Sequence, residues 1–230
     1  MKAVSPDLDW KGAQVPVSKQ FDDPYYSLEN GLKEAQHVFL AANGLPDRFQ
    51  DGLSIAELGF GAGLNFLTTL QAWQRSGQEG QLQFASFEAY PLTQADLIRA
   101  LQPFDIIAPL AQELVDGWSD LLRTGQWKSG DVNLSLNIGD ARITLPRWKG
   151  RANCWYLDGF SPAKNPELWE ADLLSEVFFH TENEGTATTY TAAGYVRRNL
   201  EDAGFWVERA EGYGRKRHMT VARKGSKDAE

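Results

Sequence analysis

Short apolar runs alternate with amphipathic helical segments along most of this chain, and this order constrains its fold more than any other feature. The expected strands are residues 55–58, 84–88, 132–138, 153–157, 186–190, 205–209 and 219–222, and the expected helices are 28–42, 65–75, 93–101, 167–179 and 193–203. Such alternation favours a parallel sheet covered by helices on both faces. A short loop containing Gly212 joins the last two strands, so these are expected to be antiparallel neighbours. The sequence therefore predicts an α/β, Rossmann-like fold with a seven-stranded, mostly parallel sheet and an antiparallel last strand.

Length and composition are consistent with one such domain. With 230 residues, 42% of them hydrophobic, the chain can bury a substantial core. We expect a small N-terminal extension and helix (residues 1–50) packed on a domain of residues 51–225, with a tail at 226–230. No run approaches the roughly 18 apolar residues of a membrane span, and no signal-peptide pattern opens the chain. Cys154 is the only cysteine, so an internal disulfide is excluded. We therefore expect a cytoplasmic protein without membrane contact.

The segment ELGFGAGLN (residues 57–65) indicates the class of cofactor. Its candidate cofactor-binding residues are Glu57, Gly59, Gly61, Gly63 and Asn65. A dinucleotide fingerprint would place a glycine where this chain has Leu64, and no Gly-Lys-Ser/Thr follows to form a phosphate-binding loop. The compact G-x-G-x-G spacing suits S-adenosylmethionine, whose carboxylate can lie near the amides that open the following helix.

Two later segments add candidate cofactor contacts. Glu88 ends the second expected strand, where a carboxylate can accept hydrogen bonds from both ribose hydroxyls. Gly139, Asp140 and Ala141 follow the third, where the aspartate could meet the adenine amino group. Asp140 is equally well suited to be a helix N-cap, and one residue could both cap a helix and contact the adenine. No cluster of histidine, cysteine and carboxylate side chains has zinc-like spacing, so we expect no metal.

The segment LDGFSPAKNP (residues 157–166) follows an apolar run and carries the candidate chemistry. Because ligands of open α/β sheets bind beyond the carboxyl ends of the strands, Asp158 is expected to face a substrate. A carboxylate followed by an aromatic residue, Phe160, and a proline can hold a reacting amine. The alternative is a turn carboxylate that caps its own backbone.

Taken together, these segments resemble the methyltransferase component of bacterial 5-methylaminomethyl-2-thiouridine tRNA biosynthesis. The matching segments are PVS (16–18), FDDPYYS (21–27), NGL (30–32), VFL (38–40), GFGAGLNFL (59–67), FE (87–88), PL (91–92), LDGFSPAKNP (157–166), AGYVRR (193–198) and GRKR (214–217). The sequence departs from the common pattern at Ala62, where threonine is frequent, and at residues 178–185, where a proline-glycine turn is usual.

The resemblance implies a class I methyltransferase that methylates the primary amine of 5-aminomethyl-(2-thio)uridine at the tRNA wobble position. Asp158 would orient the amine or receive its proton, Phe160 would form a wall beside the target base, and Tyr25 would cover the cofactor or fasten the N-terminal segment to the core. In many bacteria this domain is fused to an FAD-dependent oxidase acting earlier in the pathway. This chain offers no second glycine fingerprint, so we expect no FAD in it. The alternatives are a methyltransferase for another amine, or a non-catalytic nucleotide- or RNA-binding module.

A tRNA substrate also needs a basic surface, although the net charge is −8. Phosphate contacts act over about a Debye length, so a local basic face is enough. The loop after strand 205–209 should emerge on the substrate side of the sheet. We therefore expect anticodon-stem contacts from Arg215, Lys216 and Arg217, with Lys164, Arg197 and Arg198 nearby and Tyr190 ending the preceding strand on that side. The alternative is a structural hairpin whose basic residues pair with local acids.

Overall fold

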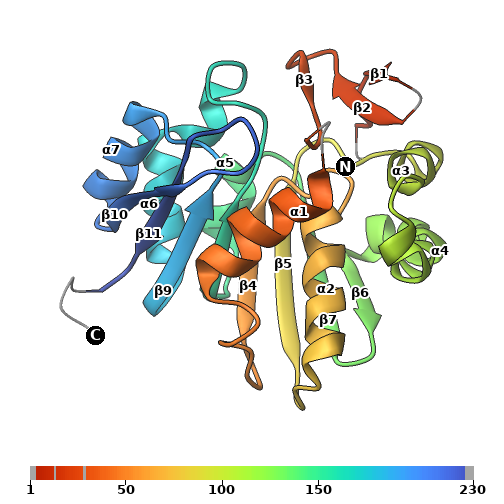
Figure 1. Cartoon of the computed structure of the whole chain (residues 1–230), viewed down its shortest axis with the longest axis horizontal. Coiled ribbons are helices and arrows are strands. Elements are labelled where there is room, and N and C mark those ends of the chain that lie inside the picture. Colours follow the sequence, from red (N-terminus) through yellow and green to blue (C-terminus); the bar gives the residue numbers. More distant parts are fainter. Residues whose placement is uncertain (1–3, 13, 28–29, 226–230) are drawn as a thin grey trace.

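The computed structural model describes residues 4–12, 14–27 and 30–225, and its main feature is an eight-stranded sheet (Figure 1). The spatial order of the strands is β10-β11-β9-β8-β4-β5-β7-β6. Their bounds are β4 Ser54–Leu58, β5 Leu82–Glu88, β6 Gln126–Ser129, β7 Val132–Ile138, β8 Ala152–Leu157, β9 Thr181–Thr189, β10 Trp206–Glu211 and β11 His218–Arg223. Six strands run in one direction, whereas β6 and β11 are antiparallel to their neighbours. The predicted α/β, mostly parallel fold is confirmed, including the antiparallel final pair.

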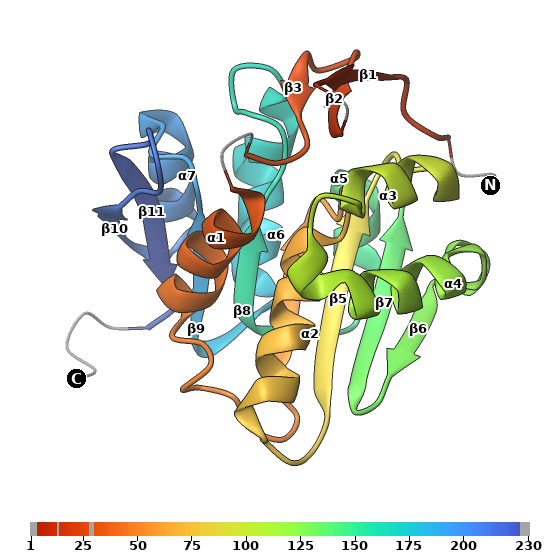
Figure 2. The same cartoon turned by 45° about the vertical axis from the view of Figure 1, so that its right-hand side comes forward.

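Helices cover both faces of this sheet (Figures 1 and 2). The α-helices are α1 Gly31–Ala35, α2 Leu64–Ser76, α3 Gln94–Leu101, α4 Ala108–Thr124, α5 Ala141–Thr144, α6 Ala171–Phe179 and α7 Gly194–Ala203. One apolar core lies between the sheet and helices α1 to α4, and a second lies between the sheet and α5 to α7. Strand β8 supplies both, because Tyr156 belongs to the first core and Trp155 to the second. Burial on both faces explains why this strand is apolar from Cys154 to Leu157.

Two predicted helices differ in detail from the structure. The predicted helix 28–42 begins in residues outside the described part of the chain; from Gly31 it runs as α1, a π-helix (Gln36–Leu40) and a 3-10 turn (Ala41–Asn43). Gly44 ends it with a φ of 72°, as the Asn43-Gly44 pair predicts. The predicted helix 167–179 divides into a 3-10 turn (Pro166–Trp169) and α6.

Helix α4 and strand β6 are among the elements that the sequence did not predict, and with β6 the sheet has eight strands rather than the predicted seven. Helix α4 carries an apolar face, but Gly117 in its interior weakens the helical signal. A Cβ atom at Gly117 would collide with the indole ring of Trp127, so glycine lets β6 pack closely on the helix. Strand β6 is a four-residue edge strand with mostly exposed or half-exposed side chains, and its pattern is too short to identify.

The N-terminal segment forms a separate three-stranded sheet above the carboxyl ends of the parallel strands (Figure 2). Its strands are β1 Leu8–Lys11, β2 Val15–Ser18 and β3 Asp23–Pro24. Tyr26, which follows β3, donates hydrogen bonds from its hydroxyl to the carbonyls of Gln14 and Ala100, so it fastens the segment to α3. Within the described residues, no helix is long and apolar enough to cross a membrane.

Candidate active site

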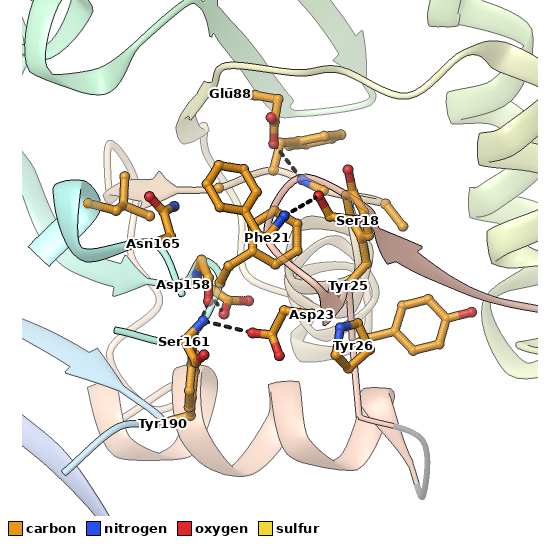
Figure 3. A pocket seen from close by; sticks show the side chains of 18 of the residues that line it. Ser18, Phe21, Asp23, Tyr25, Tyr26, Glu88, Asp158, Ser161, Asn165 and Tyr190 are labelled. Carbon is orange, nitrogen blue, oxygen red and sulfur yellow. Dashed lines mark hydrogen bonds between the residues drawn. The ribbon is translucent and has the colours of Figure 1, made fainter. Parts of the chain in front are cut away.

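A cavity of about 760 Å³ lies at the carboxyl ends of the parallel strands, beneath the N-terminal sheet (Figure 3). This volume is in the range of small-molecule and cofactor sites, which is about 300–1,000 Å³. Of the predicted site residues, those that line it are Tyr25, Gly59, Gly61, Asn65, Glu88, Asp140, Ala141, Asp158, Phe160, Tyr190, Arg215 and Lys216. Among the described residues, the predicted positions that do not line it are Glu57, Gly63, Gly139, Lys164, Arg197, Arg198 and Arg217.

The glycine loop forms one wall of the cavity between β4 and α2. Gly59 and Gly61 have φ values of 85° and 53°, which favour glycine. A Cβ atom at Gly59 would lie 2.5 Å from the Asp158 carbonyl oxygen, so glycine here lets the two loops approach each other. A Cβ atom at Gly61 would lie 3.2 Å from the Tyr25 ring. The bare backbone of this loop therefore lets both the Asp158 loop and the Tyr25 ring approach it closely at the cavity wall.

Gly63 has a different position from the other two glycines. It precedes the first residue of α2 with a φ of 71°, and a Cβ atom there would lie 2.9 Å from the Phe60 ring. Its small size therefore serves packing beneath the loop.

Asn65, in the first turn of α2, joins the buried carboxyl group of Glu57 to the half-buried one of Asp158. Its Nδ2 donates to Asp158 Oδ2 at 2.8 Å and to Glu57 Oε1 at 3.0 Å. Glu57 also accepts from the Ser86 hydroxyl at 2.7 Å, and its side chain is fully buried below the cavity floor. Glu57 therefore holds Asn65 in place, and Asn65 in turn orients the carboxyl of Asp158.

Burial shifts the protonation of both acids. It raises the pKa of Glu57 to about 8, against the hydrogen bonds from Ser86 and Asn65. Burial likewise raises the pKa of Asp158 to about 7. The Asn65 hydrogen bond and the Lys216 charge oppose that shift, whereas the Glu34 charge adds to it. Asp158 can thus exchange a proton near neutral pH, which a general base requires.

Glu88, at the end of β5, faces the glycine loop. Its Oε2 accepts from the Gly61 amide at 2.9 Å, and its Oε1 accepts from the Tyr90 amide at 2.7 Å. Burial raises the pKa of Glu88, and these backbone hydrogen bonds oppose the shift. Its position beside a glycine loop suits a carboxylate that would accept ribose hydroxyls.

The predicted N-cap role of Asp140 is confirmed. It is the N-cap of α5, where it accepts from the Arg142 amide at 2.9 Å, and it pairs with the Arg142 guanidinium at 2.7 Å. These hydrogen bonds hold the pKa of Asp140 below its usual value. Asp140 and Ala141 also line the cavity, so the predicted cofactor contact is compatible with the cap.

The loop that carries Asp158 is fastened to the N-terminal sheet (Figure 3). The Phe160 ring stacks on Phe21 with the ring centroids 4.8 Å apart, and the Tyr25 ring meets it edge-on at 5.1 Å. Asp23 accepts from the Ser161 amide at 2.7 Å. One face of the predicted aromatic wall is therefore covered by Phe21. The Gly159 carbonyl, which follows Asp158 in the same loop, accepts from the Tyr190 hydroxyl at 2.7 Å.

The predicted tRNA-binding cations fall into two groups. Arg215 and Lys216 reach the cavity, and the Lys216 ammonium pairs with Glu34 at 2.8 Å. Away from the cavity, Lys164 bonds the Asp22 carbonyl and pairs with its carboxylate at 3.0 Å, while Arg197 lies 3.7 Å from Glu201.

Phe21, Asp23 and Glu34 are among the cavity residues that the sequence did not identify as part of a site. The first two belong to the segment FDDPYYS, which was noted only as part of a resemblance, and its mixture of aromatic and acidic residues was the available signal. Glu34 lies on a helix, where an acidic residue ordinarily faces solvent. In the described part of the chain, no group of histidine, cysteine and acidic residues could hold a metal ion.

Comparisons with known proteins agree with this geometry. A family model described as S-adenosyl-L-methionine-dependent methyltransferase matches residues 105–225. One relative is the tRNA 5-methylaminomethyl-2-thiouridine biosynthesis bifunctional protein MnmC of Aeromonas salmonicida. It is 41% identical to this chain over an alignment of 236 positions, which covers 96% of this chain and 35% of that protein. The protein of the same name from Pseudomonas aeruginosa is 43% identical over an alignment of 225 positions, which covers 92% of this chain and 34% of that protein. This chain thus spans about a third of the length of these curated relatives.

A solved structure shares the fold. The crystal structure of MnmC2 from Aquifex aeolicus matches 95% of this chain and 70% of that chain with a TM-score of 0.75, at 24% sequence identity.

Proposed function

Because this chain belongs to the family of S-adenosyl-L-methionine-dependent methyltransferases, we propose that it methylates the primary amine of 5-aminomethyl-(2-thio)uridine at the wobble position of tRNA. The product would be 5-methylaminomethyl-(2-thio)uridine. One observation carries the proposal: a half-buried aspartate, Asp158, is oriented by Asn65 and shares a cavity with a glycine loop suited to the cofactor. The choice of substrate is supported by the relatives, which are named for the biosynthesis of this nucleoside.

The cofactor would lie along the glycine loop. The backbone of Gly59 and Gly61 leaves space for it, the Glu88 carboxylate would accept its ribose hydroxyls, and Asp140 would lie at its adenine. Tyr25, whose phenol is kept neutral because burial raises its pKa, would cover it from the N-terminal side. When bound, S-adenosylmethionine supplies an electrophilic methyl group on a sulfonium.

Asp158 would prepare the amine for attack. An alkylamine is mostly protonated at neutral pH and has no lone pair to offer in that state. The Asp158 carboxylate, fixed by Asn65, would accept an N–H of the amine, take up its proton and aim the lone pair at the methyl group. Because methyl transfer needs little covalent help from the protein, this positioning supplies much of the catalysis.

The surroundings of the cavity suit an RNA substrate. Arg215 at the rim and the neighbouring Arg217 would contact anticodon-stem phosphates, with Lys164, Arg197 and Arg198 further out. Splayed anticodon bases would reach the Phe160 loop, as single-stranded RNA bases do in other RNA-binding sites. In the cell this reaction would occur in the cytoplasm, after an FAD-dependent oxidase has exposed the amine. The relatives are named bifunctional, so a partner or fused domain would provide that activity.

The test is transfer of labelled methyl from S-adenosylmethionine to bulk tRNA from a strain that lacks this activity, followed by nucleoside analysis. We expect label in 5-methylaminomethyl-2-thiouridine. Saturable cofactor binding with no label in tRNA would be consistent with the family assignment and would contradict the proposed substrate.

A further inference from the structure

The ammonium group of Lys216 lies inside the cavity, where it contacts two groups. Its Nζ is 2.8 Å from Glu34 Oε1 and 3.8 Å from the centroid of the Tyr190 ring. The Glu34 side chain is 14% exposed, whereas that of Lys216 is 45% exposed. The carboxylate is therefore a fixed, nearly buried part of the wall, and the lysine reaches it from the surface loop between β10 and β11.

A carboxylate beside the face of an aromatic ring is a favourable site for a primary ammonium. The carboxylate accepts its N–H groups, and the ring attracts its charge. Tyr190 is also held in place, because its hydroxyl donates to the Gly159 carbonyl at 2.7 Å, next to Asp158. The site made by Glu34 and Tyr190 therefore adjoins the aspartate.

The substrate proposed above carries the same chemical group as lysine, a primary ammonium on a methylene. We propose that Glu34 and Tyr190 form the subsite that receives the protonated aminomethyl group of the nucleoside, and that Lys216 occupies this subsite until the substrate displaces it. The inference rests on the proposed function for the identity of the ligand. From this subsite the bound ammonium releases a proton to the neighbouring Asp158 carboxylate, which leaves the neutral amine.

This assignment explains why a lysine in a basic loop points into the cavity. A phosphate-binding lysine is expected to extend towards solvent, yet Lys216 forms an ion pair within the cavity wall. An internal occupant also excludes ligands that bind too weakly to displace it. Because the apparent affinity of a ligand falls with the fraction of protein ready to bind, removal of the occupant should strengthen binding of the correct ligand.

The test measures binding rather than methyl transfer, so that its failure is distinct from failure of the proposed function. The probes are 5-aminomethyluridine and the neutral analogue 5-hydroxymethyluridine, titrated calorimetrically into the full chain with S-adenosylhomocysteine present. We expect Lys216→Met to bind the aminomethyl nucleoside about tenfold more tightly than wild type, with little change for the hydroxymethyl analogue. The double variant E34Q/K216M should lose this gain.

Lys33→Met is the matched control, because Lys33 is an exposed lysine next to Glu34 that does not line the cavity. It should bind both nucleosides as wild type does. If Lys216→Met binds the aminomethyl nucleoside no better than wild type, or gains affinity equally for both probes, the inference is wrong. If the expected selectivity appears but tRNA is not methylated, the subsite stands and the proposed substrate fails.

Discussion

Asn65 Nδ2 lies 2.8 Å from Asp158 Oδ2, and this hydrogen bond connects the helix that follows the glycine loop to a carboxyl group in the cavity wall. The same nitrogen donates to Glu57 at 3.0 Å. The helix that follows the glycine loop is thus connected through one amide to both Glu57 and the proposed base.

Replacing Asn65 should alter the protonation of Asp158. The Asn65 hydrogen bond lowers the Asp158 pKa, in opposition to burial. In Asn65→Ala that pKa should therefore rise, and the acid limb of the kcat/KM profile should move to higher pH by about one unit. The pH dependence of methyl transfer measures this. The control is Asn133→Ala on β7, which removes a 2.7 Å hydrogen bond from Asn133 to Gln81 and should leave the profile in place.

Asp158→Asn should remove the proton acceptor while retaining the shape of the side chain. We expect kcat for tRNA methylation to fall by about 10²–10⁴-fold, the usual contribution of a general base. Cofactor affinity, measured by calorimetry, should change far less. The control is Asp131→Asn, at an exposed turn before β7. Activity near the wild-type value in Asp158→Asn would show that the carboxylate does not take the proton.

The close approach of Gly59 to the Asp158 loop predicts a contrast between two alanine substitutions. Gly59 and Gly52 have φ values of 85° and 76°, so alanine is strained at either position. A Cβ atom would collide with the Asp158 carbonyl at Gly59 but meets nothing within 4 Å at Gly52. Gly52→Ala should therefore cost about 1 kcal/mol of stability and leave cofactor binding intact. Gly59→Ala should lose more stability and weaken cofactor binding as well. Equal effects of the two substitutions on stability and binding would refute the close approach.

How far the sequence predicts this molecule depends on how local each feature is. Strands such as β8 are recognisable because they carry a continuous apolar run, here Cys154–Leu157. The parallel order then brings the glycine loop and Asp158 to one edge of the sheet. Helix α4 is obscured by Gly117, whose purpose appears only when Trp127 is packed against it. The π-helical turn at Gln36–Leu40 could not be predicted either, because its apolar pattern is the same as that of an α-helix.

The contacts that complete the site join residues far apart in the sequence, and so they could not be predicted from local sequence patterns. Glu34 and Lys216 are 182 residues apart, and Phe21 and Phe160 come from different sheets and loops. Charge and spacing along the chain predict that Lys216 is available for phosphate. Only the packing of α1 against the cavity reveals its acidic partner.

Glu57 should make the fold less stable in alkaline solution. Its pKa is raised from 4.5 to about 8 in the folded protein, so the folded state binds more protons than the unfolded state between these values. Its contribution to stability is complete below the unfolded pKa and is lost as pH rises through about 8. Asp158, raised to about 7, acts in the same direction.

Glu57→Gln tests this expectation. A glutamine can still accept from Asn65 and can donate to the Ser86 hydroxyl, so the hydrogen bonds can be kept while the titration is removed. Urea unfolding between pH 6 and pH 9 should show a smaller loss of stability in the variant than in wild type. Parallel curves for the two proteins would contradict the assignment.

The most direct test of the central claim uses a defined tRNA that carries 5-aminomethyl-2-thiouridine at the wobble position. The purified chain is incubated with this tRNA and S-adenosylmethionine, and the released nucleosides are identified by mass spectrometry. A tRNA with 5-hydroxymethyl-2-thiouridine serves as the matched substrate control. The account predicts one added methyl group on the aminomethyl nucleoside with wild type, little with Asp158→Asn and none on the control tRNA. An unmodified aminomethyl nucleoside after incubation with wild-type protein that binds the cofactor would contradict it.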